Sequence, residues 1–273
     1  MLDEAAGIIM RIRSLLIVTI MTLSSLSSAI ATDTVTTQDI DLSGNHTMTG
    51  NYTVSHGTTL TIKPGSVIDM QEYWMKVEGT LVVDNSTIMS SIQSASPGGH
   101  NAGVWDSVTI VSGGNAILDN VTISNAKSCL IIDGSLIAKS LTIEDCLIGV
   151  EVAGTADISG LSIESVDNDG VRVSGGATLS QVEILSATTG ISSTGSLVLD
   201  HANFEQIGTG LSLDGGTADV EDLNFVSGVG TGVSVTSNVS GDVEGMTGTS
   251  GNAIVAIDST GFHFSNVDMS GQR

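Results

Sequence analysis

Four charged residues near the middle of the chain could do acid–base chemistry. Asp167 and Asp169 lie in the run Asp167–Gly170, Arg172 follows two residues later, and Glu151 precedes Arg172 by 21 residues. Paired carboxylates roughly 5–10 Å apart can cleave glycosidic bonds. The structural alternative is that Asp and Gly form a turn and that Glu151 and Arg172 form an exposed ion pair worth under about 1 kcal/mol. We favour this alternative, so these residues are catalytic candidates only if the protein is an enzyme.

Metal or cofactor chemistry has little support in the sequence. The five histidines are His46, His56, His100, His201 and His263. None has a partner at metal-ligand spacing. We therefore expect no cofactor and, at most, weak Ca²⁺ binding by scattered carboxylates.

The elements that would position these residues follow a repeat. The first residue of Val150–Gly154 has apolar counterparts 20–22 residues apart, with one gap of 33: Met75, Val108, Leu130, Val171, Ile191, Leu211, Val233 and Val255. Each repeat holds three short alternating runs, such as Leu136–Ala138, Leu141–Ile143 and Val150–Val152. Alternation with period two indicates a strand with one buried face. Such short repeats leave no room for a crossover helix, so strands of successive repeats must stack in parallel.

Two inward columns should form a continuous core. One is Ile123, Ile143, Ile163, Ile184, Phe204, Phe225, Met246 and Met269, and the other is Val152, Val173, Ser193, Leu213, Val235 and Ile257. Corner glycines at Gly134, Gly154, Gly175, Gly195 and Gly215 should supply the backbone conformations of tight turns. The sequence predicts an all-β fold, a right-handed single-stranded parallel β-helix of about ten coils of 20–22 residues with three short strands per coil. The alternative is a β-sandwich, whose strand spacing would not be locked to a repeated unit.

One part of the chain resembles a known group of proteins. Gly50, Tyr52, Val54, Gly57, Leu60–Ile62 and Pro64–Gly65 resemble the first coil of secreted right-handed parallel β-helix proteins of the pectin-lyase-like superfamily, of the cell-surface type. Trp105–Val108 is similar to a Trp-Gly-x-Ile element of many surface members, with Asp106 in place of Gly. The resemblance covers about residues 50–270 and implies the fold rather than an activity.

Relatives with this fold include polysaccharide lyases and glycoside hydrolases. Asp167–Gly170 loosely resembles the Asn-Thr-Asp-Gly element of polygalacturonases, but the chain lacks that family's Asp-Asp, Gly-His-Gly and Arg-x-Lys elements. Lyases of this fold would also need calcium-binding carboxylates and a basic residue. We therefore expect no lyase or hydrolase activity on acidic polysaccharides.

The organisation of the chain follows from these patterns. Residues 1–31 are expected to be a signal peptide, with the basic segment Met10–Arg13, the short apolar run Leu15–Leu23 and the small-residue site Ala29–Ala31. An uncleaved N-terminal anchor is the alternative. Residues 32–50 should be an irregular cap, and residues 51–273 the β-helix, with a surface-loop insertion at 90–103 and a degenerate coil at 237–250. The C-terminal end should be open, with the chain continuing beyond Arg273 or stacking on another copy.

Three further sets of residues stand out. Cys129 and Cys146 should lie about one coil apart, as either a disulfide or two buried thiols. Five sequons, at Asn45, Asn51, Asn85, Asn120 and Asn238, permit N-glycosylation. Val82, Ile117 and Ile137 are aliphatic at outward positions, and we predict a contact strip there.

The net charge of the chain argues against some classes of binding partner. A formal net charge of −22 argues against nucleic acid and anionic membrane surfaces. The leading interpretation is a secreted or cell-surface solenoid, non-catalytic, that contacts a cell-surface polysaccharide or protein, or another copy end to end, without a membrane span after signal cleavage. The alternative is a carbohydrate-active enzyme, or an inactive relative that binds polysaccharide. An ice-binding solenoid would need a long Thr array, but the column of Thr122, Thr142 and Ser162 gives way to Glu183.

Overall fold

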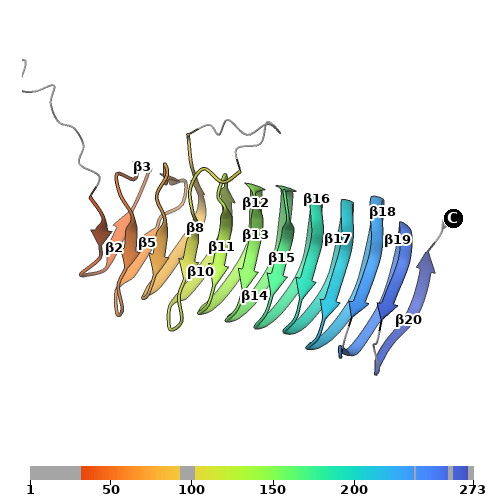
Figure 1. Cartoon of the computed structure of the whole chain (residues 1–273). Coiled ribbons are helices and arrows are strands. Elements are labelled where there is room, and N and C mark those ends of the chain that lie inside the picture. Colours follow the sequence, from red (N-terminus) through yellow and green to blue (C-terminus); the bar gives the residue numbers. More distant parts are fainter. Residues whose placement is uncertain (1–31, 93–101, 237, 258–260, 270–273) are drawn as a thin grey trace, which may run out of the picture. The chain divides into compact units, whose positions relative to one another are not determined.

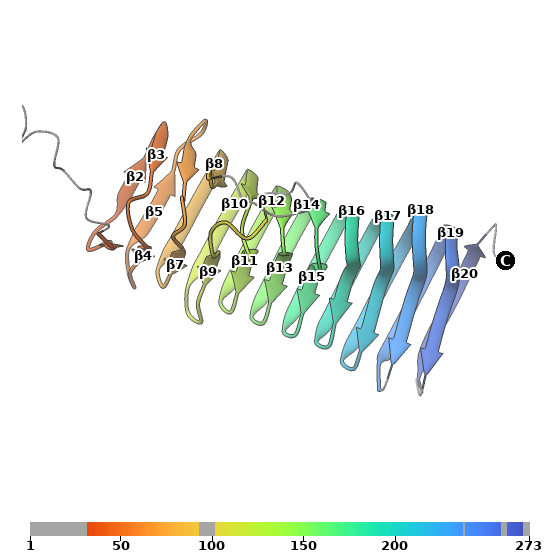
Figure 2. The same ribbon diagram turned by 45° about the horizontal axis from the view of Figure 1, so that its top comes forward.

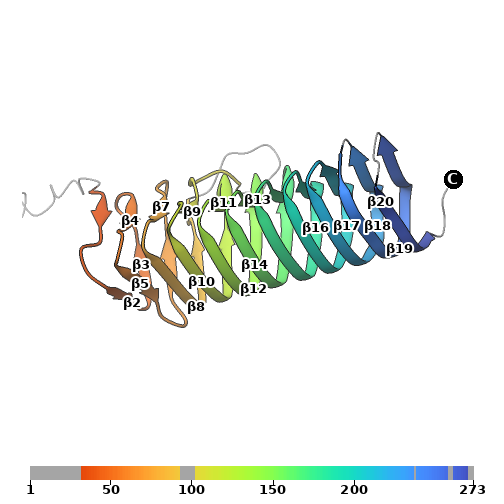
Figure 3. The same ribbon diagram turned by 90° about the horizontal axis from the view of Figure 1, so that it is seen from below.

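The computed structural model describes residues 32–92, 102–236, 238–257 and 261–269. From Asp33 onward the chain forms one compact unit. This unit is a parallel β-solenoid of about 11 turns, with no helix in the described residues. Figure 1 shows the coils following one another in sequence order up to the blue β20, and Figures 2 and 3 show the same stack from two other directions. The predicted all-β parallel β-helix is confirmed.

Strand length changes along the solenoid. The short strands are β1 (Thr34–Val35), β2 (Ile40–Leu42), β3 (Asn45–Thr47), β4 (Tyr52–Val54), β5 (Thr59–Ile62), β6 (Val67–Asp69), β7 (Met75–Val77), β9 (Val108–Ile110), β11 (Ser128–Ile132), β13 (Ile148–Val152) and β15 (Asp169–Val173). The longer strands are β8 (Thr80–Met89), β10 (Asn115–Ser124), β12 (Ser135–Cys146), β14 (Thr155–Val166), β16 (Gly176–Ser193), β17 (Ser196–Asp214), β18 (Thr217–Thr236), β19 (Ser240–Ile257) and β20 (Phe262–Met269). In the later coils the backbone stays paired through the corners, so one bent strand replaces three short ones. The prediction of three short strands per coil holds only for the first coils.

The inward columns stack in register. Ile123 pairs with Ile143, Ile143 with Ile163, and Ile163 with Ile184. The column continues through Phe204 to Phe225, whose rings are stacked with centroids 5.5 Å apart. All of these side chains are buried. The hydrophobic alternation therefore sets the register, because a shift by one residue would turn the column outward.

Beyond Phe225 the predicted columns are wrong for Met246 and Ile257 but right for Met269, which continues the Phe225 column through Gly248. Phe225 pairs with Gly248, whereas Met246 pairs with Leu223. In the other column Val235 pairs with Ala256 rather than Ile257, and likewise Val233 pairs with Ile254 rather than Val255. The physical reason is a longer corner before β19 together with a register shift between Phe225 and Val229. Counting a constant period through these two irregularities misplaces Met246, Val255 and Ile257.

The corners are of two kinds. At the first, the predicted conformational role of glycine is correct for Gly215, which has a φ of 93°, but wrong for the other four glycines. Gly134, Gly154, Gly175 and Gly195 do not have positive φ. A Cβ at each of them would instead overlap a backbone oxygen of the preceding coil, so close stacking requires glycine there. At another corner left-handed residues are stacked coil upon coil, and they are mostly not glycine: Asn85, Asn120, Ser140, Gly160, Gln181, His201, Asp222, Gly245 and Asn266. Short polar residues tolerate this conformation better than apolar ones do.

The ends of the chain were only partly predictable. Residues 32–50 contain β1, β2 and β3, which pair with β4, β5 and β6. The expected irregular cap is therefore itself a coil of the solenoid. The predicted signal peptide, residues 1–31, lies outside the described residues, as does most of the insertion at 90–103. Among the described residues, no helix has the length and apolar character needed to cross a membrane.

Candidate functional site

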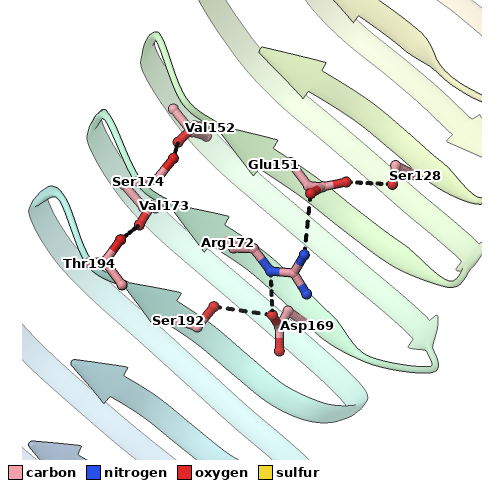
Figure 4. A network of polar contacts seen from close by, with 9 residues as sticks. All are labelled: Ser128, Glu151, Val152, Asp169, Arg172, Val173, Ser174, Ser192 and Thr194. Atoms are coloured by element: carbon pink, nitrogen blue, oxygen red, sulfur yellow. Dashed lines mark hydrogen bonds and ion pairs between the residues drawn. The ribbon is translucent and has the colours of Figure 1, made fainter. Parts of the chain in front are cut away.

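Of the four charged residues singled out from the sequence, Glu151 lies on β13, and Asp169 and Arg172 lie on β15 (Figure 4). Asp167 lies in the bend before β15. Arg172 Nε donates to Asp169 Oδ2 at 2.8 Å, and Arg172 Nη1 donates to Glu151 Oε2 at 3.3 Å. Ser128 donates to Glu151 and Ser192 donates to Asp169, which extends the network across neighbouring coils. Asp167 contributes its backbone carbonyl, which accepts a hydrogen bond from Thr188.

This network can do little chemistry. The guanidinium of Arg172 pairs with both carboxylates, and each carboxylate also accepts a hydrogen bond from a serine, so both Asp169 and Glu151 are engaged in contacts between coils. Its ion pairs are partly exposed, and such pairs contribute at most about 1 kcal/mol. Asp167 does not join the ion pairs. The arrangement supports the structural interpretation of these residues.

A groove lies on the outer face of the second strand of several successive coils. It measures about 460 Å³ and spans β14, β16, β17 and β18. Its polar lining residues are Ser162, Glu164, Glu183, Asn203, Glu205 and Asn224. We call this hollow the acidic groove, because three glutamates line it and no Lys, Arg or His is among its described lining residues.

The floor of the acidic groove is a ladder of polar side chains in register. Ser162 pairs with Glu183, Glu183 with Asn203, and Asn203 with Asn224. Asn224 Nδ2 donates to Asn203 Oδ1 at 3.0 Å, and Ser227 Oγ donates to Glu205 Oε1 at 2.9 Å. The ladder therefore offers a hydroxyl, a carboxylate or an amide at each coil.

A second hollow lies on the outer face of the first strand. It measures about 400 Å³, and its lining includes Ile137, Asp157, Thr178 and Val198. The predicted contact strip reaches this hollow: Ile117 pairs with Val82 on one side and with Ile137 on the other. Ile117 is 48% and Ile137 51% exposed. The contact strip of Val82, Ile117 and Ile137 is therefore present as predicted, and its role in contacts stays a prediction.

The sequence analysis missed a cluster at His201. His201 Nε2 lies 3.1 Å from Asp222 Oδ2, and His201 Nδ1 contacts Asp200. Among the described residues this is the only group of three or more His, Cys, Asp or Glu ligand atoms lying within 4.8 Å of one another. The search for histidine partners at metal-ligand spacing along the sequence did not find this cluster. The partner is 21 residues away in sequence and one coil away in space, so aligning the coils column by column would have revealed it.

The remaining candidate residues are the two cysteines and the five sequon asparagines. Cys129 and Cys146 are buried and joined in a disulfide, with their Cα atoms 6.0 Å apart. Among the sequons, Asn45, Asn85, Asn120 and Asn238 are exposed, whereas Asn51 is half-buried and accepts a hydrogen bond from the Trp74 amide. Asn120 also donates to Asn85. Their use for glycans stays a prediction.

Comparisons with known proteins support the fold. No protein-family model and no curated protein matches this sequence. Among solved structures, the enzymatically active domain of bacteriophage CBA120 tailspike protein 2 is 12% identical, with a TM-score of 0.55, over 83% of this chain and 42% of that one. A tailspike mutant of E. coli bacteriophage HK620, in complex with a pentasaccharide, is 9% identical, with a TM-score of 0.53, over 89% of this chain and 56% of that one. This chain thus spans about half the length of these proteins. At these identities the likeness concerns architecture alone, and it agrees with the parallel β-helix fold of this chain.

Proposed function

We propose that this chain is a non-catalytic, extracellular or cell-surface β-solenoid that binds a glycan along the acidic groove. The observation that carries the proposal is the in-register ladder of Ser162, Glu183, Asn203 and Asn224 on the groove floor. Its side chains are hydrogen-bonding groups that match sugar hydroxyls. The tailspike of bacteriophage HK620, which has the same architecture, is known in complex with a pentasaccharide.

The spacing of the ladder suits a linear glycan. Adjacent parallel strands are about 4.8 Å apart, which is close to the length of one hexose unit. A glycan lying along the solenoid axis would therefore present one sugar to each coil. Leu185 and Val226 also line the groove, and apolar side chains can cover the C–H faces of sugar rings.

The charge of the groove indicates the class of glycan. Glu164, Glu183 and Glu205 line it, and the whole chain carries a formal charge of −22. A uronic-acid polymer would be repelled by this field, since like charges oppose association. We therefore expect a neutral or amino-bearing glycan.

The absence of a base favours binding over catalysis. A lyase must abstract a proton, and no basic side chain is among the described lining residues. A second candidate function is glycoside hydrolysis, and one observation favours it. Glu205 lies two residues along the strand and one coil across from Glu183, so the Cα atoms of the two glutamates are roughly 8 Å apart. This lies within the range of about 6.5–9.5 Å that inverting hydrolases use.

One binding experiment tests the proposal. The full chain is titrated calorimetrically with neutral, amino-bearing and uronic-acid oligosaccharides. The variant N203A/N224A should lose at least tenfold in affinity for the bound class, because it removes two ladder rungs. The matched control N115A changes an exposed Asn on the first-strand face and should bind as wild type does. Wild-type chain that binds none of these glycans, or a ladder variant that binds equally well, would overturn the proposal.

An activity assay separates the two candidate functions. The same oligosaccharides are incubated with the chain, and newly formed reducing ends are measured. We expect none. Reducing ends that appear with wild type and vanish with E183Q or E205Q would instead establish the hydrolase. Because a Glu→Gln change preserves shape, retained binding by these variants would exclude misfolding as the cause.

A further inference from the structure

The cluster at His201 lies next to the acidic groove but faces another hollow. This hollow measures about 190 Å³, and its lining includes His201, Asp222, Asn224 and Thr247. His201 comes from β17 and Asp222 from β18. Both residues have left-handed backbone, with φ of 57° and 54°. The corner therefore points an imidazole and a carboxylate from successive coils at each other.

We propose that His201 and Asp222 bind a divalent cation of the zinc type, with Asp200 orienting the imidazole. The two ligand atoms would be His201 Nε2 and Asp222 Oδ2, and water would complete the coordination. This site is independent of the glycan-binding proposal.

The distance between the two ligand atoms fits this role. Zinc binds imidazole nitrogen and carboxylate oxygen at about 2.0–2.2 Å, so two neighbouring ligands of a tetrahedral or octahedral ion lie roughly 3.0–3.4 Å apart. Nε2 and Oδ2 are 3.1 Å apart. An ion can therefore sit between them without rearrangement of the backbone.

Asp200 supplies the outer contact that metal-binding histidines commonly have. It contacts His201 Nδ1. A histidine that ligates through one nitrogen usually donates the N–H of the other to a carboxylate, which fixes the tautomer and strengthens the ligand. Here Nδ1–H would donate to Asp200, which leaves Nε2 free for the ion.

The field around the cluster favours a cation. Asp200, Glu221 and Glu244 are stacked in register on successive coils. Directly opposed like charges destabilise a sheet. Asp219 and Asp242 form a second such pair in the neighbouring column. A single imidazole cannot neutralise these carboxylates, whereas a bound divalent ion offsets two charges.

The donor set selects among cations. An imidazole nitrogen with carboxylate oxygens suits zinc and related transition metals, while Ca²⁺ prefers oxygen ligands only. Two direct protein ligands and an exposed position imply binding weaker than at a structural zinc site, which has four protein ligands.

Protons should compete with the ion. Asp200 foremost, then Asp222 and Glu221, raise the pKa of His201 above its ordinary value. The residue stacked on the other side is the uncharged Gln181. Zinc binds the neutral imidazole, so a proton on Nε2 and a bound ion exclude each other.

The test is a zinc titration of the full chain. Zinc chloride is added to ¹⁵N-labelled protein, and the ring nitrogens of the histidines are followed by NMR, with calorimetry for affinity. We expect the His201 Nε2 resonance to move as that of a metal ligand, and H201A and D222N to lose at least tenfold in affinity. D200N should lose about tenfold, the size typical of an outer contact. The control is H263A, an exposed histidine whose strand neighbour in register is Asp242, and it should leave the affinity unchanged.

The result that would overturn the proposal is equally concrete. If H201A binds zinc as wild type does, or if the His201 ring stays an imidazolium at saturating zinc and neutral pH, then the cluster is only an ion pair. Thermal midpoints with and without zinc give a second measurement. Zinc should raise the midpoint of wild type but not of H201A, and an equal rise in both would also refute the site.

Discussion

Ser193 offers the sharpest test of the core. It occupies a buried column between Val173 and Leu213, and its exposed fraction is 2%. Its hydroxyl has no hydrogen-bond partner among the described residues. A buried polar group without a partner costs about 1–3 kcal/mol. The replacement S193V should therefore stabilise the protein.

The magnitude follows from the neighbours. Val173 precedes the site and Leu213 follows it, so the column accommodates side chains of this size. Removing the hydroxyl recovers about 1 kcal/mol at the low end, and the added carbon buries apolar area worth about 0.8 kcal/mol. We expect S193V to raise the free energy of unfolding by about 1–2 kcal/mol, and S193A by less, because alanine leaves the space unfilled.

Urea denaturation followed by circular dichroism measures the effect, with equal m-values as the check that both states are unchanged. The matched control is S192V, on the outward side of the same strand. Ser192 donates to Asp169, so this control should be neutral or destabilising. Loss of stability in both S193V and S193A would refute the reasoning, since it would mean that the hydroxyl is satisfied by a buried water.

Two further predictions concern a corner and a carboxylate. A Cβ at Gly210 would lie 2.5 Å from the ring of Phe225, whereas one at Gly176 would meet nothing within 4 Å. We therefore expect G210A to lower the urea midpoint by the equivalent of about 1–3 kcal/mol in unfolding free energy, and the control G176A to leave it unchanged. Equal midpoints for the two variants would contradict the close packing at Gly210. Partial burial alone would raise the pKa of Asp69, but hydrogen bonds from Ser91 and Gln71 together outweigh it and hold that pKa below its ordinary value. Such a group stabilises the fold above its unfolded pKa of about 4, and this stabilisation is lost as the pH falls through the folded pKa. The urea midpoint of wild type should therefore exceed that of D69N by less and less between about pH 6 and pH 3. A difference between the two midpoints that does not change with pH would contradict the assignment.

The sequence determines most of this fold because the same physical constraint repeats at every coil. Ile143, Ile163 and Ile184 each face the core, so the register follows from alternation alone. The hydrophobic pattern does not predict the register where the coil length changes. The longer corner before β19 and the compensating shift after Phe225 leave no sign in that pattern. Gly215 has the positive φ that the sequence predicts. The other four corner glycines are required by close approach between coils, which is a property of the stack rather than of the local sequence.

The candidate sites were harder to predict for a related reason. Asp167–Gly170 drew attention because it is a contiguous motif, yet the ion pairs to Arg172 occupy its Asp169. His201 and Asp222 drew none, because their proximity depends on stacking rather than on sequence neighbourhood. In a solenoid, residues one coil apart are the true neighbours, so the informative alignment runs down the columns.

The conformation of one corner also explains why ligand-type side chains gather there. Its stacked left-handed positions include Asn120, His201 and Asp222. Bulky apolar residues adopt this backbone at a cost, while Asn, Asp and His are enriched in it. Asn, Asp and His are also residue types whose side chains can bind cations or form hydrogen bonds with sugars. On β17 the corner residue His201 is followed, at alternate positions, by Asn203 and Glu205, which line the acidic groove. A steric requirement of the turn thus places a potential metal ligand two residues from a potential glycan-binding ladder, on the same outward face of one strand.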